Sequence, residues 1–167
     1  DPKCDPLEEK ARALGCDVVR GDENNVLSRF VEACRRHGPD AVVRVCADNP
    51  FVSPAEIDKL AEFFYEGSFE YACNNTPESG LPDGFGAEMV AARLLTGVAD
   101  TADEATREHV TQFILDNPES YKTGLLKADA GLARPEIKLD VDTLQDYHKI
   151  KRVCEALPSG NAPFWSC

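Results

Sequence analysis

The sequence lacks a long apolar run, and it has few basic residues for its acidic content. No window of about 18 consecutive apolar residues occurs, which excludes a hydrophobic membrane-spanning helix. The 167 residues include 18 Lys and Arg against 30 Asp and Glu, a net charge of −12. Because non-specific binding to nucleic acid needs a basic surface, this balance argues against a nucleic-acid polymer as partner. An anionic small molecule would need local Arg or Lys, or a metal ion.

Closely spaced cysteine pairs are also missing. The seven cysteines form no C-x-x-C pair, which argues against a zinc site and a disulfide-stapled scaffold. We therefore expect a reduced, cytoplasmic protein. The start, Asp1 to Cys4, shows neither an initiator methionine nor a signal-peptide pattern, which suggests an internal stretch of a longer chain.

Helical and extended apolar patterns alternate along the first half of the chain. Helices are expected over 5–14, 26–37 and 54–66, and strands over 16–21, 42–47 and 69–73. This alternation predicts a three-layer, doubly wound α/β fold with a mostly parallel sheet. In the second half we expect strands over 88–91, 121–126 and 137–141, and helices over 93–99, 103–117 and from Thr143 onward. A single domain should cover 1–157, followed by an irregular tail over 158–167.

The most informative stretch is the β-branched run that stops at Asp48, Asn49 and Pro50. Pro50 cannot continue a sheet ladder, so the strand should end near Ala47. Asp48 then lies just beyond the carboxyl end of a buried strand, where open α/β sheets bind ligands. A divalent cation is one partner for such a carboxylate. The alternative is that Asp48 only forms an Asx turn.

A second carboxylate, Asp142, ends the strand pattern of 137–141. Alternation puts Lys138, Asp140 and Asp142 on one face. Asp48 and Asp142 are far apart in the chain but can converge at one edge of a sheet, and magnesium is usually held by one or two carboxylates plus substrate phosphates. The simpler interpretation makes Asp142 a helix cap.

Other polar residues are candidates for binding or catalysis. Arg44 lies within an apolar strand, so it needs a buried acidic partner or an anionic ligand. Arg20 is a weaker candidate at another strand end. Arg107 and His109 share a helical turn. Arg107 could clamp a phosphate or carboxylate, with an ordinary surface ion pair as the alternative; His109 could act as a base, with a satisfied, partly buried histidine as the alternative. The length of the loop 74–86 favours a substrate loop. Asp83 and Glu88 bracket its Gly-rich part and could hydrogen-bond sugar hydroxyls, although loop solubility explains them equally well.

Five short motifs, in one order, resemble those of the cytidylyltransferases of the spore-coat polysaccharide biosynthesis type. These are relatives of the enzymes that activate acidic sugars with CTP. The family patterns are RGSEDDVLxRY, VVRITxDxP, NN…PDGxDxE, REHVT and TVDT. The matching stretches here are RGDENNVLSRF (20–30), VRVCADNP (43–50), NN with LPDGFGAE (74–75 and 81–88), REHVT (107–111) and VDT (141–143).

This resemblance implies a nucleotide-diphospho-sugar transferase fold. It implies that CTP reacts with a sugar, acidic or amino in character, to give a CMP-sugar and pyrophosphate. It also implies Mg²⁺ held by Asp48 and Asp142. Such a transfer depends on alignment and on neutralising developing charge. CTP and a sugar are the expected partners, and a homodimer stays open. The residues implied for the substrate site are Asn74, Asn75, Asp83, Glu88, Arg107 and His109.

The chain departs from the family pattern in three places. Its sequence starts after the family's first strand and the nucleotide-holding loop QARxxSxRLPGK, so we expect an amino-terminally truncated domain. Asp140 stands where relatives have a Trp-Thr pair, and residues 85–87 replace LDV, which leaves sugar specificity open. Two alternatives remain: a truncated non-catalytic fragment or interaction domain, and nucleotidyl transfer to a non-sugar acid.

Overall fold

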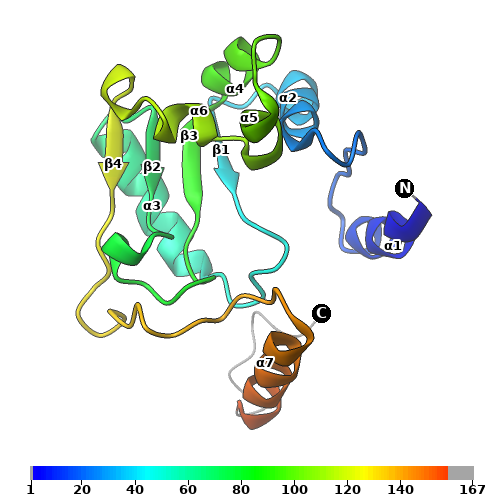
Figure 1. Cartoon of the computed structure of the whole chain (residues 1–167), viewed down its shortest axis with the longest axis vertical. Helices are drawn as coiled ribbons and strands as arrows, with labels where there is room; N and C mark the ends of the chain where they lie inside the picture. Colours follow the sequence, from blue (N-terminus) through cyan, green and yellow to red (C-terminus); the bar gives the residue numbers. More distant parts are fainter. Residues whose placement is uncertain (1, 158–167) are drawn as a thin grey trace.

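The chain forms one four-stranded sheet covered by helices, and the computed structural model describes residues 2–157 (Figure 1). The strands are β1 (Ala41–Arg44), β2 (Tyr71–Cys73), β3 (Glu88–Ala91) and β4 (Thr123–Leu125). The α-helices are α1 (Asp5–Ala13), α2 (Val26–His37), α3 (Pro54–Glu66), α4 (Ala92–Val98), α5 (Glu104–His109), α6 (Gln112–Leu115) and α7 (Leu144–Ala156). Short 3₁₀ turns are η1 (Pro2–Cys4), η2 (Pro77–Ser79) and η3 (Pro118–Ser120).

Polar side chains cap the first turns of α2, α3 and α7. The Asn25 side chain accepts from the Ser28 amide at the start of α2, and Ser53 accepts from the Glu56 amide at the start of α3. Thr143 and Asp146 form a reciprocal capping box on α7. These local bonds fix where each helix begins.

The strand order is β1-β3-β2-β4. β1 and β2 both run antiparallel to β3, and β4 runs parallel to β2. Three strands therefore point the same way, and β3 is inserted between two of them in the opposite direction. The predicted α/β class is confirmed. The prediction of a mostly parallel sheet holds for strand direction but not for neighbouring pairs, because β3 returns directly beside β1.

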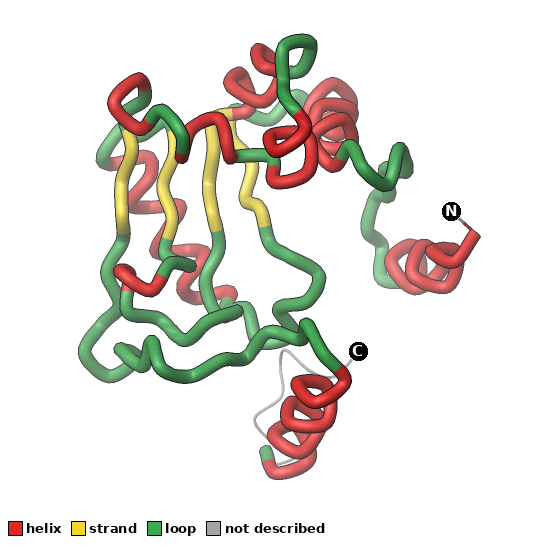
Figure 2. The backbone as a smooth tube through the Cα atoms, in the orientation of Figure 1, coloured by secondary structure: helices red, strands yellow, loops and turns green. Residues whose placement is uncertain are grey.

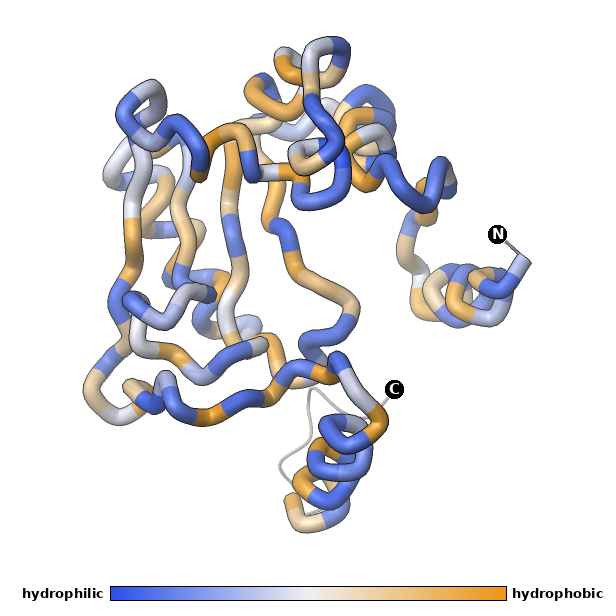
Figure 3. Tube along the Cα trace, in the orientation of Figure 1, coloured by the Kyte–Doolittle hydropathy of each residue, from blue (hydrophilic) through white to orange (hydrophobic). Residues whose placement is uncertain are grey.

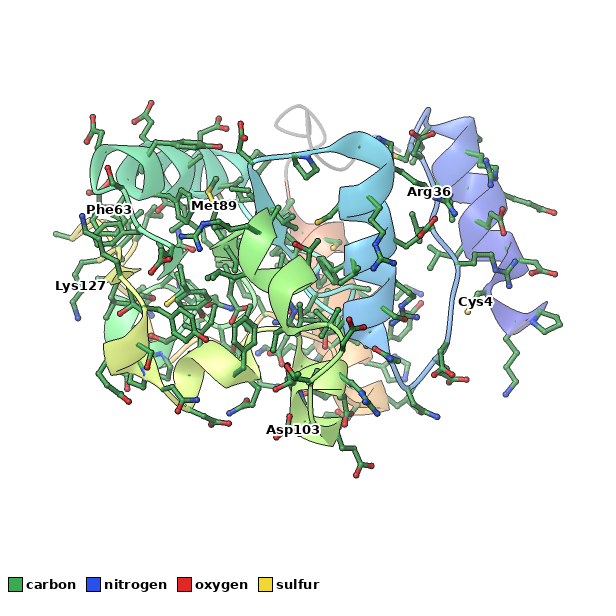
Figure 4. The ribbon with its side chains drawn as sticks, turned by 90° about the horizontal axis from the view of Figure 1, so that it is seen from above. Cys4, Arg36, Phe63, Met89, Asp103 and Lys127 are labelled. Atoms are coloured by element: carbon green, nitrogen blue, oxygen red, sulfur yellow. The ribbon has the colours of Figure 1, made fainter. Side chains whose placement is uncertain are left out.

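Helices cover both faces of the sheet, as a three-layer fold requires. On one face, Ala72 and Met89 pack against Leu60 and Phe64 of α3. On the other, the strand residues Tyr71, Cys73 and Val90 pack against α2, α4 and the α5–α6 region. Seen from above in Figure 4, α3 with Phe63 lies on one side, Asp103 at the start of α5 lies on the other, and Met89 lies between.

Several predicted elements differ in the structure. Residues 16–21 and 137–141 form no strand, because neither segment builds a ladder with a neighbouring strand; the second makes one isolated parallel bridge, Asp83 with Lys138. β1 is shorter than predicted, because it ends at Arg44; Val45 lies beyond it and is exposed. Among the described strands, β1 pairs with β3 alone. The helix predicted over 103–117 is split into α5 and α6 at Val110, whose φ is +61°.

α1 and α7 lie at the periphery (Figure 1). No residue of α1 is buried, and Ile150 is the buried residue of α7. Among the described residues, no helix combines the length and apolar character needed to cross a membrane. The irregular tail predicted over 158–167 lies outside the described residues.

Candidate active site

Three segments that are distant in sequence meet at the lower edge of the sheet, and we call them the rim: residues 46–49, 83–85 and 137–142. The Val141 amide donates to the Asp48 carbonyl at 2.9 Å. The Asp83 amide donates to the Ile137 carbonyl at 2.8 Å, and the Leu139 amide donates to the Asp83 carbonyl at 2.9 Å. Figure 2 shows that loops form this edge. The rim is therefore held by backbone bonds without regular strands.

The rim brings Asp48 beside the segment that carries Asp142. The bond between Val141 and Asp48 joins the residue before Asp142 to Asp48 itself. Both side chains are exposed, and the Asp142 side chain is 58% exposed. The backbone therefore brings the segments of Asp48 and Asp142 together at this edge of the sheet.

Lys138 contacts two of the acidic side chains of the rim, those of Asp140 and Asp142. Its Nζ donates to Asp140 Oδ2 at 2.5 Å and to Asp142 Oδ2 at 2.7 Å. The hydrogen bond from Lys138 holds the pKa of the Asp142 carboxyl below its usual range. Figure 3 shows hydrophobic and hydrophilic colours alternating along the segment that leads into α7, as the alternation of apolar and charged residues over 137–142 requires. Within residues 2–157, no three acidic, histidine or cysteine side chains already stand as a metal-holding group.

A small pocket next to the rim contains two of the predicted sugar-binding residues, Asn75 and Asp83. Its volume is about 150 Å³. Asn75 Oδ1 is buried and has no hydrogen-bond partner among the described residues. A buried amide oxygen of this kind needs a donor, and a ligand hydroxyl can supply one. The complete lining is Asn75, Thr76, Pro77, Leu81, Asp83 and Pro135.

Asn74, the neighbour of Asn75, is instead fully used inside the protein. It is 1% exposed. Its Nδ2 donates to the Glu56 carbonyl at 3.1 Å, and its Oδ1 accepts from the Ala87 amide at 2.8 Å. A Cβ on Gly86 would lie 2.5 Å from the Asn74 carbonyl oxygen, so glycine is needed there. Asn74 thus closes the base of the loop 74–86.

Glu88 is the centre of a buried network, which we call the Glu88 cluster: Arg44, Tyr71, Glu88 and Thr111. Arg44 Nη1 donates to Glu88 Oε2 at 2.9 Å, from the position directly opposite in the β1–β3 register. Tyr71 donates to Oε1 at 3.0 Å, and Thr111 Oγ1 donates to Oε2 at 3.1 Å. Burial and the Glu88 charge raise the pKa of the Tyr71 hydroxyl. Arg44 therefore has the buried acidic partner that its position in the strand required.

Sequence reasoning did not single out Thr111. It follows the positive-φ residue Val110, which turns the chain between α5 and α6 and directs Thr111 towards Glu88. A positive φ at a β-branched residue is rare and marks a conformation imposed by its surroundings. The REHVT motif was the available signal, but its contact with Glu88 depends on tertiary structure.

The remaining candidates lie away from the rim contacts. Arg107 and His109 are exposed on α5, on the face of the sheet that carries the Glu88 cluster. Neither side chain hydrogen-bonds to the rim in the described part of the chain. Arg20 Nη1 donates to Asp5 Oδ1 at 2.6 Å and to Glu8 Oε2 at 2.7 Å, which ties the segment after α1 back to that helix.

Solved structures share this α/β fold. A cytidylyltransferase from Leptospira borgpetersenii superposes with a TM-score of 0.86 at 23% identity, covering 95% of this chain and 67% of that one. A CMP:2-keto-3-deoxy-manno-octonic acid synthetase complexed with CTP gives 0.62 at 15% identity, covering 93% and 78%. This is the fold of nucleotide-diphospho-sugar transferase-like proteins.

Within that class, the chain belongs to the cytidylyltransferase family, whose family model matches residues 1–159. It is 32% identical over 149 residues to the spore coat polysaccharide biosynthesis protein SpsF of Bacillus subtilis, covering 88% of this chain and 60% of that protein. It is 34% identical over 142 residues to the uncharacterised protein MJ1063 of Methanocaldococcus jannaschii, covering 84% and 57%. The chain therefore spans about three fifths of these curated relatives.

Proposed function

We propose that the protein transfers CMP from CTP to a sugar of acidic or amino character and releases pyrophosphate. The observation that carries this proposal is the match to the cytidylyltransferase family over almost the whole chain. The name of the Bacillus relative refers to spore coat polysaccharide, and the synthetase with the same fold is complexed with CTP and named for an acidic sugar. A sugar destined for a surface polysaccharide is the corresponding acceptor.

The rim supports a place for the triphosphate and its metal ion. Asp48 and Asp142 would hold Mg²⁺, as two carboxylates that leave room for substrate phosphates. The buried Oδ1 of Asp140, which has no hydrogen-bond partner among the described residues, fits a cation or a donor beside them. When bound, Mg²⁺ supplies neutralisation of the phosphate charge and alignment of the attacked phosphorus. The chain's own contribution is to fix the two carboxylates at one edge by the bond between Val141 and Asp48.

The pocket beside the rim supports a place for one end of the sugar. Its 150 Å³ is room for a few polar groups rather than a whole nucleotide sugar. A sugar hydroxyl would donate to the unpartnered Asn75 Oδ1, and Asp83 would accept a second hydroxyl at the mouth. Asn74 acts as a positioning residue, since its own polar atoms are already bonded within the fold.

The Glu88 cluster supports a positioning role for Arg44 and Glu88. Their pairing joins β1 to β3, and Thr111 joins that pair to the end of α5. Arg107 and His109 would approach the sugar from α5, where Arg107 would pair with an acidic group. Arg20 would meet the substrate only by exchanging its present carboxylate partners on α1.

The test measures pyrophosphate release by the protein with CTP, Mg²⁺ and a panel of acidic and amino sugars. We expect release that needs both CTP and Mg²⁺. Asp48→Asn should abolish it, whereas Asp58→Asn, which changes an exposed carboxylate on α3, should not. No release with any sugar, or equal release by Asp48→Asn, would contradict the proposal. Mass measurement of the product separates a CMP-sugar from a nucleotidylated non-sugar acid.

A further inference from the structure

The ammonium of Lys138 lies between two rim carboxylates, those of Asp140 and Asp142. It contacts Asp140 Oδ2 at 2.5 Å and Asp142 Oδ2 at 2.7 Å. The side chain is 40% exposed, so it reaches this position from the solvent side on a flexible four-carbon stem. The two hydrogen bonds raise the pKa of Lys138, which keeps the ammonium charged.

Asp140 is only half satisfied by this arrangement. The residue is 9% exposed, and its Oδ1 is buried without a hydrogen-bond partner among the described residues. A buried carboxylate oxygen without a partner is costly. A Cβ on Gly84 would lie 2.8 Å from the Asp140 amide nitrogen, so the loop before β3 packs closely against the backbone of Asp140. Asp140 thus presents one oxygen to Lys138 and keeps a second with no donor.

We propose that Lys138 is the resident counter-ion of a divalent-cation site, and that Asp140 is an oxygen ligand of that site. The ammonium holds Asp140 and Asp142 together until a divalent cation displaces it into solvent. This inference rests on the proposed function, since it assumes that the rim receives a metal ion. The resemblance to known cytidylyltransferases assigns no role to Lys138 or Asp140.

The test measures Mn²⁺ binding to the protein without nucleotide. The electron paramagnetic resonance signal of free Mn²⁺ reports how much of the ion stays unbound. Lys138→Met removes the competing ammonium, so we expect this variant to bind Mn²⁺ roughly tenfold more tightly than the wild type. The gain is modest because the site is partly exposed and the removed charge is screened by solvent and salt. Lys138→Arg keeps a cation and should stay near the wild-type affinity. Asp140→Asn should weaken binding several-fold in both the wild-type and Lys138→Met backgrounds.

Lys59 provides a matched control. Its Nζ also bridges two carboxylates, Glu56 Oε1 at 2.7 Å and Asp129 Oδ2 at 2.6 Å. Among residues 2–157, no buried carboxylate oxygen at this lysine lacks a partner, and the Asp129 side chain is 72% exposed. Lys59→Met should therefore leave Mn²⁺ affinity unchanged, although it alters the net charge equally.

Three results would overturn the inference. The first is unchanged or weaker Mn²⁺ binding by Lys138→Met, and the second is an equal gain in Lys59→Met, which would reduce the effect to net charge. The third is unchanged binding in Asp140→Asn. Tighter Mn²⁺ binding by Lys138→Met in a protein that releases no pyrophosphate would support the site while contradicting the proposed function, so the two failures can be told apart.

Discussion

The Glu88 cluster and the rim both contain residues that the sequence marks as functional, yet they use their charges in opposite ways. In the Glu88 cluster, both carboxylate oxygens have protein donors, and the side chains of Glu88 and Arg44 are 9% and 18% exposed. At the rim, Asp48 is exposed and one oxygen of Asp140 has no partner among the described residues. A carboxylate whose bonding capacity is filled by the protein stabilises the fold, whereas one with spare capacity can bind a ligand.

The same contrast separates two adjacent residues, Asn74 and Asn75. The side-chain amide of Asn74 hydrogen-bonds to two backbone groups. The side-chain oxygen of Asn75 is buried without a partner among the described residues, and Asn75 lines the pocket. The sequence presents the two as one motif. The two side chains differ because the chain turns after β2, so that Asn74 is buried in the protein and Asn75 lines the pocket.

The largest effect on the free energy of unfolding is expected from Glu88→Gln, which tests whether the Glu88 cluster stabilises the fold. It leaves the Arg44 guanidinium without its charged partner in a partly buried site, and removing one member of a buried ion pair costs about 3–4 kcal/mol. We expect that loss in the free energy of unfolding measured with urea. Asp142→Asn, at an exposed position, should change it by less than about 0.5 kcal/mol.

The double variant Arg44→Met with Glu88→Gln isolates the charge effect. Removing both charges leaves no unpaired guanidinium, so much of the lost stability should return. A loss in Asp142→Asn as large as that in Glu88→Gln would mean that the two regions do not differ in the way described.

The second prediction concerns Asn74→Ala. The substitution leaves the Ala87 amide and the Glu56 carbonyl buried without their partner, and we expect a loss of about 2–3 kcal/mol. Thermal and urea unfolding both measure this loss. A loss below about 1 kcal/mol would show that water replaces the amide and that the base of the loop is not closed by Asn74.

Local sequence patterns predict the elements that depend on their own residues. The bounds of α2 and β3 agree with the periodicity and with the capping residue Asn25. Residues 16–21 and 137–141 have equally good strand patterns but form no ladder, since a strand also needs a neighbour in register. The break at Val110 was not predicted either, because nothing in the helical pattern of 103–117 signals the positive φ of Val110.

The candidate site was predictable to the same degree. The Val141 amide donates to the Asp48 carbonyl and so brings the segments of Asp48 and Asp142 together, although the strand over 137–141 on which the expectation for Asp142 depended does not form. The pairing of Arg44 with Glu88 could not be predicted, because it follows from the β1–β3 register, in which Arg44 lies opposite Glu88. Thr111 was missed as a partner of Glu88 for the same reason, whereas alternation along 138–142 already placed Lys138 on one face with Asp140 and Asp142.

The third prediction tests how closely the loop before β3 is packed against Asn74. In Gly86→Ala, the new Cβ would lie 2.5 Å from the Asn74 carbonyl oxygen, which is backbone and can yield only if the loop shifts. We expect a loss of roughly 1–2 kcal/mol, measured by urea unfolding. Gly131→Ala, where nothing lies within 4 Å of the new Cβ, is the matched control and should be neutral.

The smallest expected change in stability comes from Asn75→Ala. This variant distinguishes a structural role of Asn75 from a role in binding the sugar. The Asn75 side-chain oxygen has no partner to lose among the described residues, so the free energy of unfolding should change by less than about 0.5 kcal/mol. If the pocket receives the sugar, the same variant should raise KM for the sugar severalfold while KM for CTP stays constant. Loss of stability comparable to that of Asn74→Ala would place Asn75 among the structural residues. An unchanged KM for the sugar would instead remove the pocket from the site, because a buried acceptor that binds no hydroxyl has no effect on affinity.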